Sequence, residues 1–276
     1  MSHLGIKIRY MFLFIFGIIC ILFSGCDKLF EFSPYQGDVQ DSYKNTTQNN
    51  LTKLAETKQL TDSFSFAVIT DSHYYYDELS AMVDHINLLE CIQFVIFGGD
   101  IADQALLKEY EIFHEIMNRL NKPYFTVIGN HDYISNGELI YDQMFGARNY
   151  SFEYANSKFI LFDDIVWESN SSPDFEWLGS QLSDYQNYTY VFVSAHISPF
   201  SDQFDAIMEN TYRELMSDHY VSMSIHGHSH RYMLSEYYHD GIPYLVVPSI
   251  MASEYCIITC TPDSVDIQLI DIGQTP

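Results

Sequence analysis

The chain has 276 residues, of which 47% are hydrophobic and 18% charged, so it is long enough to bury one sizeable core. It carries 37 acidic residues against 13 basic ones, a formal charge of −24 at pH 7. A surface of this sign repels polyanions, which argues against duplex nucleic acid as a partner.

The first 26 residues resemble a bacterial export signal. Lys7 and Arg9 precede an apolar run over residues 10–23, which is short for a membrane span, and small residues follow it. The segment ends in Leu-Phe-Ser-Gly-Cys26, which resembles a lipobox, in which the cysteine becomes the lipidated first residue of the mature chain. We therefore expect an exported lipoprotein held on a membrane of the cell envelope through Cys26. A plain signal peptide and an uncleaved anchor are the alternatives, and both also export the domain.

Residues 27–63 are rich in Asn, Gln, Thr, Asp and Ser and have no sustained apolar period. This composition is typical of a flexible linker, so we expect a polar tether there, with at most a short helix over residues 51–60. The folded domain is expected over residues 64–276. Three cysteines fall in it, Cys91, Cys256 and Cys260, and we predict that they are small buried residues because an odd number argues against a disulfide framework.

The first half of this domain alternates apolar runs with helical periodicity. Strands are predicted over residues 66–70, 92–97 and 124–128, with amphipathic helices over 79–89 and 106–120 between them. This βαβαβ order predicts parallel strands joined by right-handed crossovers, and it brings the loops after the strands to one edge of a sheet.

The second half continues with strands and helices in turn. We predict strands over residues 150–154, 158–162, 190–194 and 220–225, and helices over 174–182 and 205–216. The tail over residues 232–272 is β-rich and is punctuated by Asp240-Gly and Pro262-Asp, which is typical of hairpins. We expect this tail to build a second sheet.

Five of the predicted strands end in residue types that bind metals. The blocks that follow them are Asp71-Ser-His73, Gly98-Gly-Asp100, Gly129-Asn-His-Asp132, His196 and Gly227-His-Ser-His230. Each block alone has a simpler explanation, such as a helix cap, a turn or a buried histidine. Packing gives no reason for strand after strand to end in this way, so the set predicts a metal site.

In this order the blocks resemble the calcineurin-like metallophosphoesterase family, whose pattern is Asp-x-His, Gly-Asp, Gly-Asn-His-Asp/Glu, His, Gly-His-x-His. The resemblance covers about residues 64–271. It implies an α/β fold, a four-layer α/β/β/α sandwich of two mixed sheets flanked by helices, with the metal site at the carboxyl ends of the strands. It also implies two divalent metal ions, with iron, manganese and zinc all compatible with such a nitrogen and oxygen ligand set.

The resemblance assigns the ligands residue by residue. One ion is expected at Asp71, His73, Asp100 and His230, and the other at Asp100, Asn130, His196 and His228, so that Asp100 bridges the pair. His131 is expected to face the departing oxygen instead of a metal, and Asp132 to orient its ring. One departure is visible, because proline follows His196 at the third position, as Pro199, where the family has it at the second. We expect a different loop shape there.

The reaction implied is hydrolysis of a small phosphate ester by a hydroxide that the two ions share. Likeness to the cyclic-nucleotide branch of the family favours a phosphodiesterase. A phosphomonoesterase of the same fold and a non-catalytic exported binding lipoprotein are the alternatives, and the complete set of ligand types favours an enzyme. Neither the physiological substrate nor the oligomeric state follows from the sequence.

Overall fold

The computed structural model describes residue 33 and residues 35–57 and 63–273. The chain divides into a unit of residues Met1–Gln36 and a unit of residues Gly37–Pro276, and every helix and strand below belongs to the second unit. The expected export signal and Cys26 lie outside the described residues. Among the described helices, none is both long and apolar enough to cross a membrane.

The first sheet has five strands. Their order is β11 (Val265–Asp271), β10 (Glu254–Cys260), β1 (Phe64–Ile69), β2 (Ile92–Phe97) and β3 (Tyr124–Thr126). β1, β2 and β3 are parallel, and the helices α3 (Tyr76–Leu88) and α4 (Leu107–Met117) connect them, as the alternating pattern predicts. All six residues of β1 are buried, because both faces of this sheet are covered.

The second sheet has six strands. Their order is β4 (Tyr150–Tyr154), β5 (Ser157–Phe162), β6 (Tyr190–Ala195), β7 (Met223–His226), β9 (Tyr244–Val246) and β8 (Met233–Ser235). The four inner strands are parallel to one another, while β4 and β8 are antiparallel to their neighbours. The inner strands therefore present all their carboxyl ends at one edge of this sheet.

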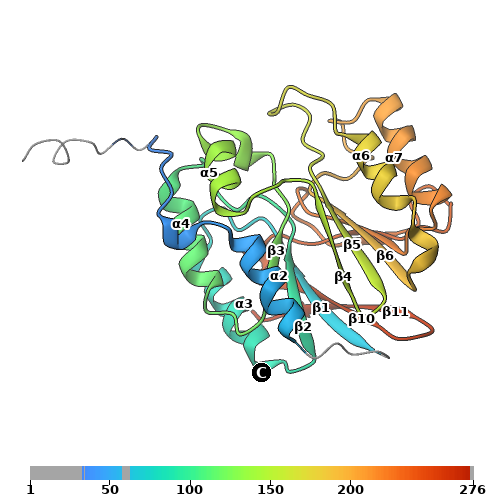
Figure 1. Ribbon diagram of the computed structural model, residues 1–276, viewed down its shortest axis with the longest axis horizontal. Helices are drawn as coiled ribbons and strands as arrows, with labels where there is room; N and C mark the ends of the chain where they lie inside the picture. The colour runs from blue at the N-terminus through green and yellow to red at the C-terminus, as the bar shows by residue number, and fades with distance from the viewer. Residues whose placement is uncertain (1–32, 34, 58–62, 274–276) are drawn as a thin grey trace, which may run out of the picture. The chain divides into compact units, whose positions relative to one another are not determined.

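The two sheets pack face to face through an aromatic core. Phe66 stacks on Phe94 at 5.2 Å between ring centroids and meets Phe159 of the other sheet edge-to-face at 5.3 Å. Helices α3, α4 and α5 (Gly137–Met144) cover the outer face of the first sheet, and α6 (Phe175–Leu182) and α7 (Ala206–Asp218) cover that of the second (Figure 1). The predicted four-layer α/β/β/α sandwich is confirmed.

The tail does not build a second sheet of its own, so that prediction is wrong. β8 and β9 extend the second sheet, whereas β10 lies antiparallel beside β1 and β11 follows it at the edge of the first. The reason is pairing: β1 has a free side away from β2, and β10 satisfies its backbone groups. Cys256 and Cys260 are buried on β10 as predicted, but Cys91 is exposed at the turn before β2.

The expected tether is wrong for residues 37–57, which belong to the domain. Residues 46–56 form the helix α2 (Thr46–Glu56), beside the edge strand β3. Asn50 donates from Nδ2 to the carbonyl oxygen of Tyr124 at 2.8 Å, and Leu54 is buried in the core between the sheets. The helix thereby covers an edge strand that would otherwise leave backbone groups unpaired. Its buried face includes Thr46, Thr47 and Asn50, so hydrophobic periodicity could not reveal it.

Because α2 is part of the core, changes on its buried face should destabilise the whole domain. Leu54→Ala is expected to lower the free energy of unfolding by about 2–5 kcal/mol, and Asn50→Ala by about 1–3 kcal/mol by leaving the Tyr124 carbonyl unpaired. Chemical denaturation of the full chain measures both. Lys53→Ala, on the exposed face of the same helix, is the matched control. Wild-type stability in all three variants would restore the tether interpretation.

Candidate metal centre

The residues predicted to bind metal come together where the carboxyl ends of both sheets meet. Asp71 and His73 follow β1, Asp100 follows β2, Asn130 follows β3, His196 follows β6, and His228 and His230 follow β7. Three groups of side chains could each hold a metal ion, because the donor atoms within each group lie within 4.8 Å of one another. The groups are Asp71 with His73 and His230, His73 with Asp100 and His131, and Asp100 with His196 and His228. Each sheet supplies part of the site.

The first group is arranged around Asp71, which is fully buried. Its Oδ2 accepts from the hydroxyl of Thr70 at 2.7 Å and from the backbone N–H of His228 at 3.2 Å. Its Oδ1 has no hydrogen-bond partner and lies 3.3 Å from Nε2 of His230. Nε2 of His73 lies 3.4 Å from the same nitrogen of His230.

The second group is arranged around Asp100. Its Oδ1 accepts from the backbone N–H of His131 at 2.9 Å, while its Oδ2 lies 3.3 Å from Nε2 of His196 and 3.8 Å from Nε2 of His73. Oδ1 of Asn130 lies 3.0 Å from Nδ1 of His228. Asp100 therefore touches both groups, as a shared ligand must.

Two buried atoms of this cluster show that its donor set fits a cation. Nδ1 of His196 donates to the carbonyl oxygen of Gly98 at 2.7 Å, which directs Nε2 into the cluster, where it has no hydrogen-bond partner. Oδ1 of Asp71 is likewise buried without a partner, 3.9 Å from that nitrogen. Buried polar atoms are rarely left unpaired, and a carboxylate oxygen and an imidazole nitrogen are ordinary ligands of zinc, manganese and iron.

The charges at the site favour the same conclusion. Burial lowers the pKa of His73 and of His228, so these imidazoles are neutral with lone pairs available to a metal. Burial also acts to lower the pKa of His196, but the carboxylates of Asp100 and Asp71 outweigh it and raise that pKa to about 10. The negative field that holds a proton on His196 in the protein alone is the field that attracts a divalent cation.

The backbone of the site is held in sparsely populated conformations. Positive φ angles occur at Asp71 (56°), His73 (43°), Asp100 (54°), His228 (65°) and His230 (56°), all of them expected ligands. Non-glycine residues adopt such angles at a cost and cluster at functional sites. Gly129 is required for close packing of two loops, because a Cβ there would lie 2.1 Å from the backbone nitrogen of Asp100.

Comparison with known proteins now identifies the family. Residues 64–232, more than half of the chain, match the family described as "Calcineurin-like phosphoesterase". The chain belongs to the calcineurin-like phosphoesterase family. It is thus a metal-dependent phosphoric ester hydrolase, and the family resemblance seen in the sequence is confirmed.

Two curated members of this kind are similar in sequence. A "probable cyclic nucleotide phosphodiesterase" of Xenorhabdus bovienii is 26% identical over 190 residues, which is 63% of this chain and 75% of that protein. A "probable glycerophosphodiester phosphodiesterase" of Arcobacter nitrofigilis is 42% identical over 53 residues, 19% of each chain.

Solved structures share the fold. A purple acid phosphatase from yellow lupin superposes with a TM-score of 0.65 at 14% identity, covering 79% of this chain and 53% of its own, so this chain spans about half its length. GAP50 of Plasmodium, described as the anchor in the inner membrane complex, superposes with a TM-score of 0.59 at 15% identity, covering 76% of this chain and 85% of its own.

Asp132 does not orient the ring of His131 in this calcineurin-like domain, so that expectation is corrected. Nδ1 of His131 bonds the carbonyl oxygen of Asp103 at 2.8 Å. The Asp132 carboxylate is fully buried, and it accepts from the backbone N–H groups of Gly129, Ile101 and Ala102 and from the hydroxyl of Tyr110. Burial raises the pKa of Asp132 to about 7, although the hydrogen bonds from these donors act to lower it. Asp132 therefore ties the loop after β2 to the loop after β3.

Asp164 holds the loop after β6 in a similar way, and the sequence analysis missed it. Its carboxylate accepts from the backbone N–H groups of His196 and Ile197, and burial raises its pKa to about 8. A signal was present, because Asp163-Asp164 directly follows the buried strand β5, in the position that carries ligands elsewhere.

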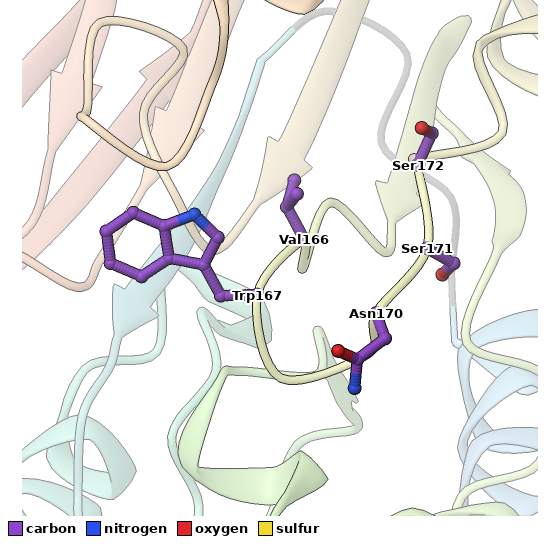
Figure 2. Close-up of a pocket in the computed structure, with 5 residues that line it drawn as sticks. All are labelled: Val166, Trp167, Asn170, Ser171 and Ser172. Carbon is purple, nitrogen blue, oxygen red and sulfur yellow. The ribbon is translucent and has the colours of Figure 1, made fainter.

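Glu168 was also missed, and no sequence pattern marks it. Its Oε1 accepts from Nδ2 of Asn130 at 3.1 Å, so the amide oxygen of Asn130 is left to face His228. Glu168 lies on the loop between β5 and α6, which curves around an open hollow of about 550 Å³ lined by residues 166, 167 and 170–172. Figure 2 shows Trp167 directed to one side of this loop, with Asn170 and Ser171 on its other arm. None of the residues lining this hollow is an expected ligand.

Proposed function

We propose that this protein is a dinuclear metal-dependent phosphodiesterase that hydrolyses small phosphate diesters. The observation that carries the proposal is the position of Asp100, whose carboxylate faces a nitrogen of each donor group, His73 on one side and His196 on the other. One ion would be held by Asp71, His73, Asp100 and His230, and the second by Asp100, Asn130, His196 and His228. Two such ions, when bound, supply an activated water and neutralise charge on the phosphate oxygens.

The residues of the chain then have separate tasks. The two carboxylates and the amide of Asn130 fix the positions of the ions, and the hydrogen bond from Asn130 to Glu168 keeps that amide in one orientation. His131 lies at the edge of the cluster, with its ring edge-to-face to that of His73 at 4.7 Å between centroids. Since its Nδ1–H donates to Asp103, its Nε2 is available to interact with the departing oxygen of the substrate.

Preference for diesters rests on the relatives. Both similar curated proteins carry phosphodiesterase names, one for cyclic nucleotides and one for glycerophosphodiesters. A phosphomonoesterase built on the same ligands remains the alternative within the family. The complete set of donors in this chain supports the enzyme.

Metal content tests the dinuclear arrangement directly. The wild-type chain, loaded with manganese or zinc and freed of excess metal, should carry about two ions, measured by elemental analysis. Asp100→Ala should lower the occupancy of both positions, and Asn130→Ala should chiefly weaken one of them. Asn118→Ala, at an amide on α4's carboxyl end, is the control. Capacity for a single ion in the folded wild type would contradict the proposal.

The role of His131 is tested with variants and two leaving groups. His131→Ala should lower turnover about 10²-fold or more for an unactivated alkyl diester, the usual scale for lost acid–base assistance, and less for a p-nitrophenyl diester, whose leaving group needs little protonation. Elemental analysis should find unchanged metal content.

Two outcomes would contradict this role. Loss of metal in His131→Ala would make His131 a ligand, which its place in one of the donor groups permits. Equal losses with both leaving groups would mean that His131 stabilises phosphoryl charge instead of assisting departure.

We further propose that the chain is exported and is anchored through a lipid on Cys26, on the strength of the amino-terminal pattern. Cys26→Ser should release the protein from the membrane fraction or block its processing, while activity on a soluble diester is kept. Cys20→Ser, within the apolar run, is the matched control. Mass spectrometry that finds an unmodified mature terminus elsewhere would rule the lipid anchor out.

A further inference from the structure

A second pocket opens directly beside the metal centre. It has a volume of about 260 Å³ and is lined by Ser198, Phe200, Ser201, Asp202, His228, Ser229, Arg231, Met233 and Val246. His228 belongs both to this lining and to the group of Asp100, His196 and His228, so the pocket adjoins that side of the centre. Small-molecule sites usually have volumes of about 300–1,000 Å³, so this one suits one part of a substrate.

Arg231 sets this pocket apart. In the described part of the chain, Arg119 pairs with Asp84, Arg148 with Asp142 and Glu138, and Arg213 with Glu214. Arg231 is exposed, and among the described residues it has no recorded hydrogen bond or ion pair. Its guanidinium is therefore available to pair with a carboxylate or a phosphate.

The other walls combine polar and apolar side chains. Phe200 stacks on Tyr237 at 4.1 Å between ring centroids, which fixes one wall. Ser198, Ser201 and Ser229 contribute hydroxyls, and Asp202 also lines the pocket. The pocket is lined by the loop that carries Pro199, where the sequence departs from the family pattern.

We propose that this pocket binds the ester group that stays on phosphorus, and that Arg231 selects phosphodiesters in which this group carries a second anion, a carboxylate or a further phosphate. The sidedness follows from the centre: His131, proposed to face the leaving oxygen, lies against His73, whereas the pocket is reached at His228. The inference rests on the proposed phosphodiesterase function and names a substrate class for it.

The test compares p-nitrophenyl phosphodiesters whose second ester group is ethyl, 2-hydroxyethyl or 2-carboxyethyl, so that the leaving group is constant. With the metal-loaded full chain, kcat/KM should be highest for the carboxyethyl ester. Arg231→Gln should lower kcat/KM for that ester about 10- to 100-fold, the usual effect of losing one charge-assisted pair, and change the ethyl ester little. Arg231→Lys should fall between, because it keeps the charge without the fork. Arg119→Gln, at a surface ion pair, should match wild type.

Binding without turnover separates this inference from the proposed function. Methyl(propyl)phosphinate and (3-carboxypropyl)(methyl)phosphinate mimic the ethyl and 2-carboxyethyl diesters and contain no P–O–C bond to be cleaved. Calorimetry should show tighter binding of the carboxylated compound by wild type but not by Arg231→Gln. Absence of turnover with this binding preference intact would overturn the phosphodiesterase function alone. Equal binding of both analogues by wild type, or equal losses for all three esters in Arg231→Gln, would overturn the anion-selective pocket.

Discussion

The carboxylate of Asp100 is the group on which the rest of the site depends. It is almost fully buried at the end of β2, where one oxygen is fixed by the backbone N–H of His131 and the other faces imidazoles supplied by both sheets. Burial acts to raise its pKa, yet His196 and the other histidines lower it, so the group is an anion at neutral pH. A buried anion surrounded by ring nitrogens is stable only with a compensating positive charge, which protons on the histidines or bound metal ions can supply.

The loops around this carboxylate are held by a second set of buried acids. Asp132 joins the loops after β2 and β3, and Asp164 fixes the loop after β6, in each case by accepting backbone N–H groups. Such bonds constrain the backbone itself, and Asp100 keeps a positive φ angle on one of the loops held in this way. The scaffold of the site is therefore polar and buried, with Asp132 joining two loops of the first sheet and Asp164 holding a loop of the second.

The centre also lies in an unusually acidic molecule. A phosphate ester approaching a chain of charge −24 meets repulsion, and Arg231, in the pocket beside the site, is a positive group that counters it locally. Not every buried histidine near the site is an expected ligand, as the group of Tyr212, Ser224 and His226 shows. They form a buried hydrogen-bonded chain behind the centre, and burial lowers the pKa of His226 to about 3, so this histidine stays neutral and serves packing.

Much of this protein could be predicted from the order of its residues. Apolar runs and helical periods predicted β2 and β4 at their observed bounds and several other elements within a few residues. For β2 the reason is burial on both faces of a parallel sheet, which leaves a continuous apolar signal. The ligand residues could be proposed because each follows a strand directly, and strand ends place side chains reproducibly. The helix α2 escaped because the face it buries is largely polar.

Other features depend on contacts between segments far apart in the chain, which local pattern does not encode. Which sheet takes the tail was decided by the free side of β1, and the orientation of His131 by the carbonyl of Asp103, 28 residues away. Glu168 accepts a hydrogen bond from Asn130, 38 residues away in the chain. Arg231 lines a pocket only because the loop of Phe200 folds beside it. The sequence by itself determined which chemical groups stand at the strand ends; only the tertiary structure decided what each of them faces, because hydrogen-bond partners are set by position in space and not by separation along the chain.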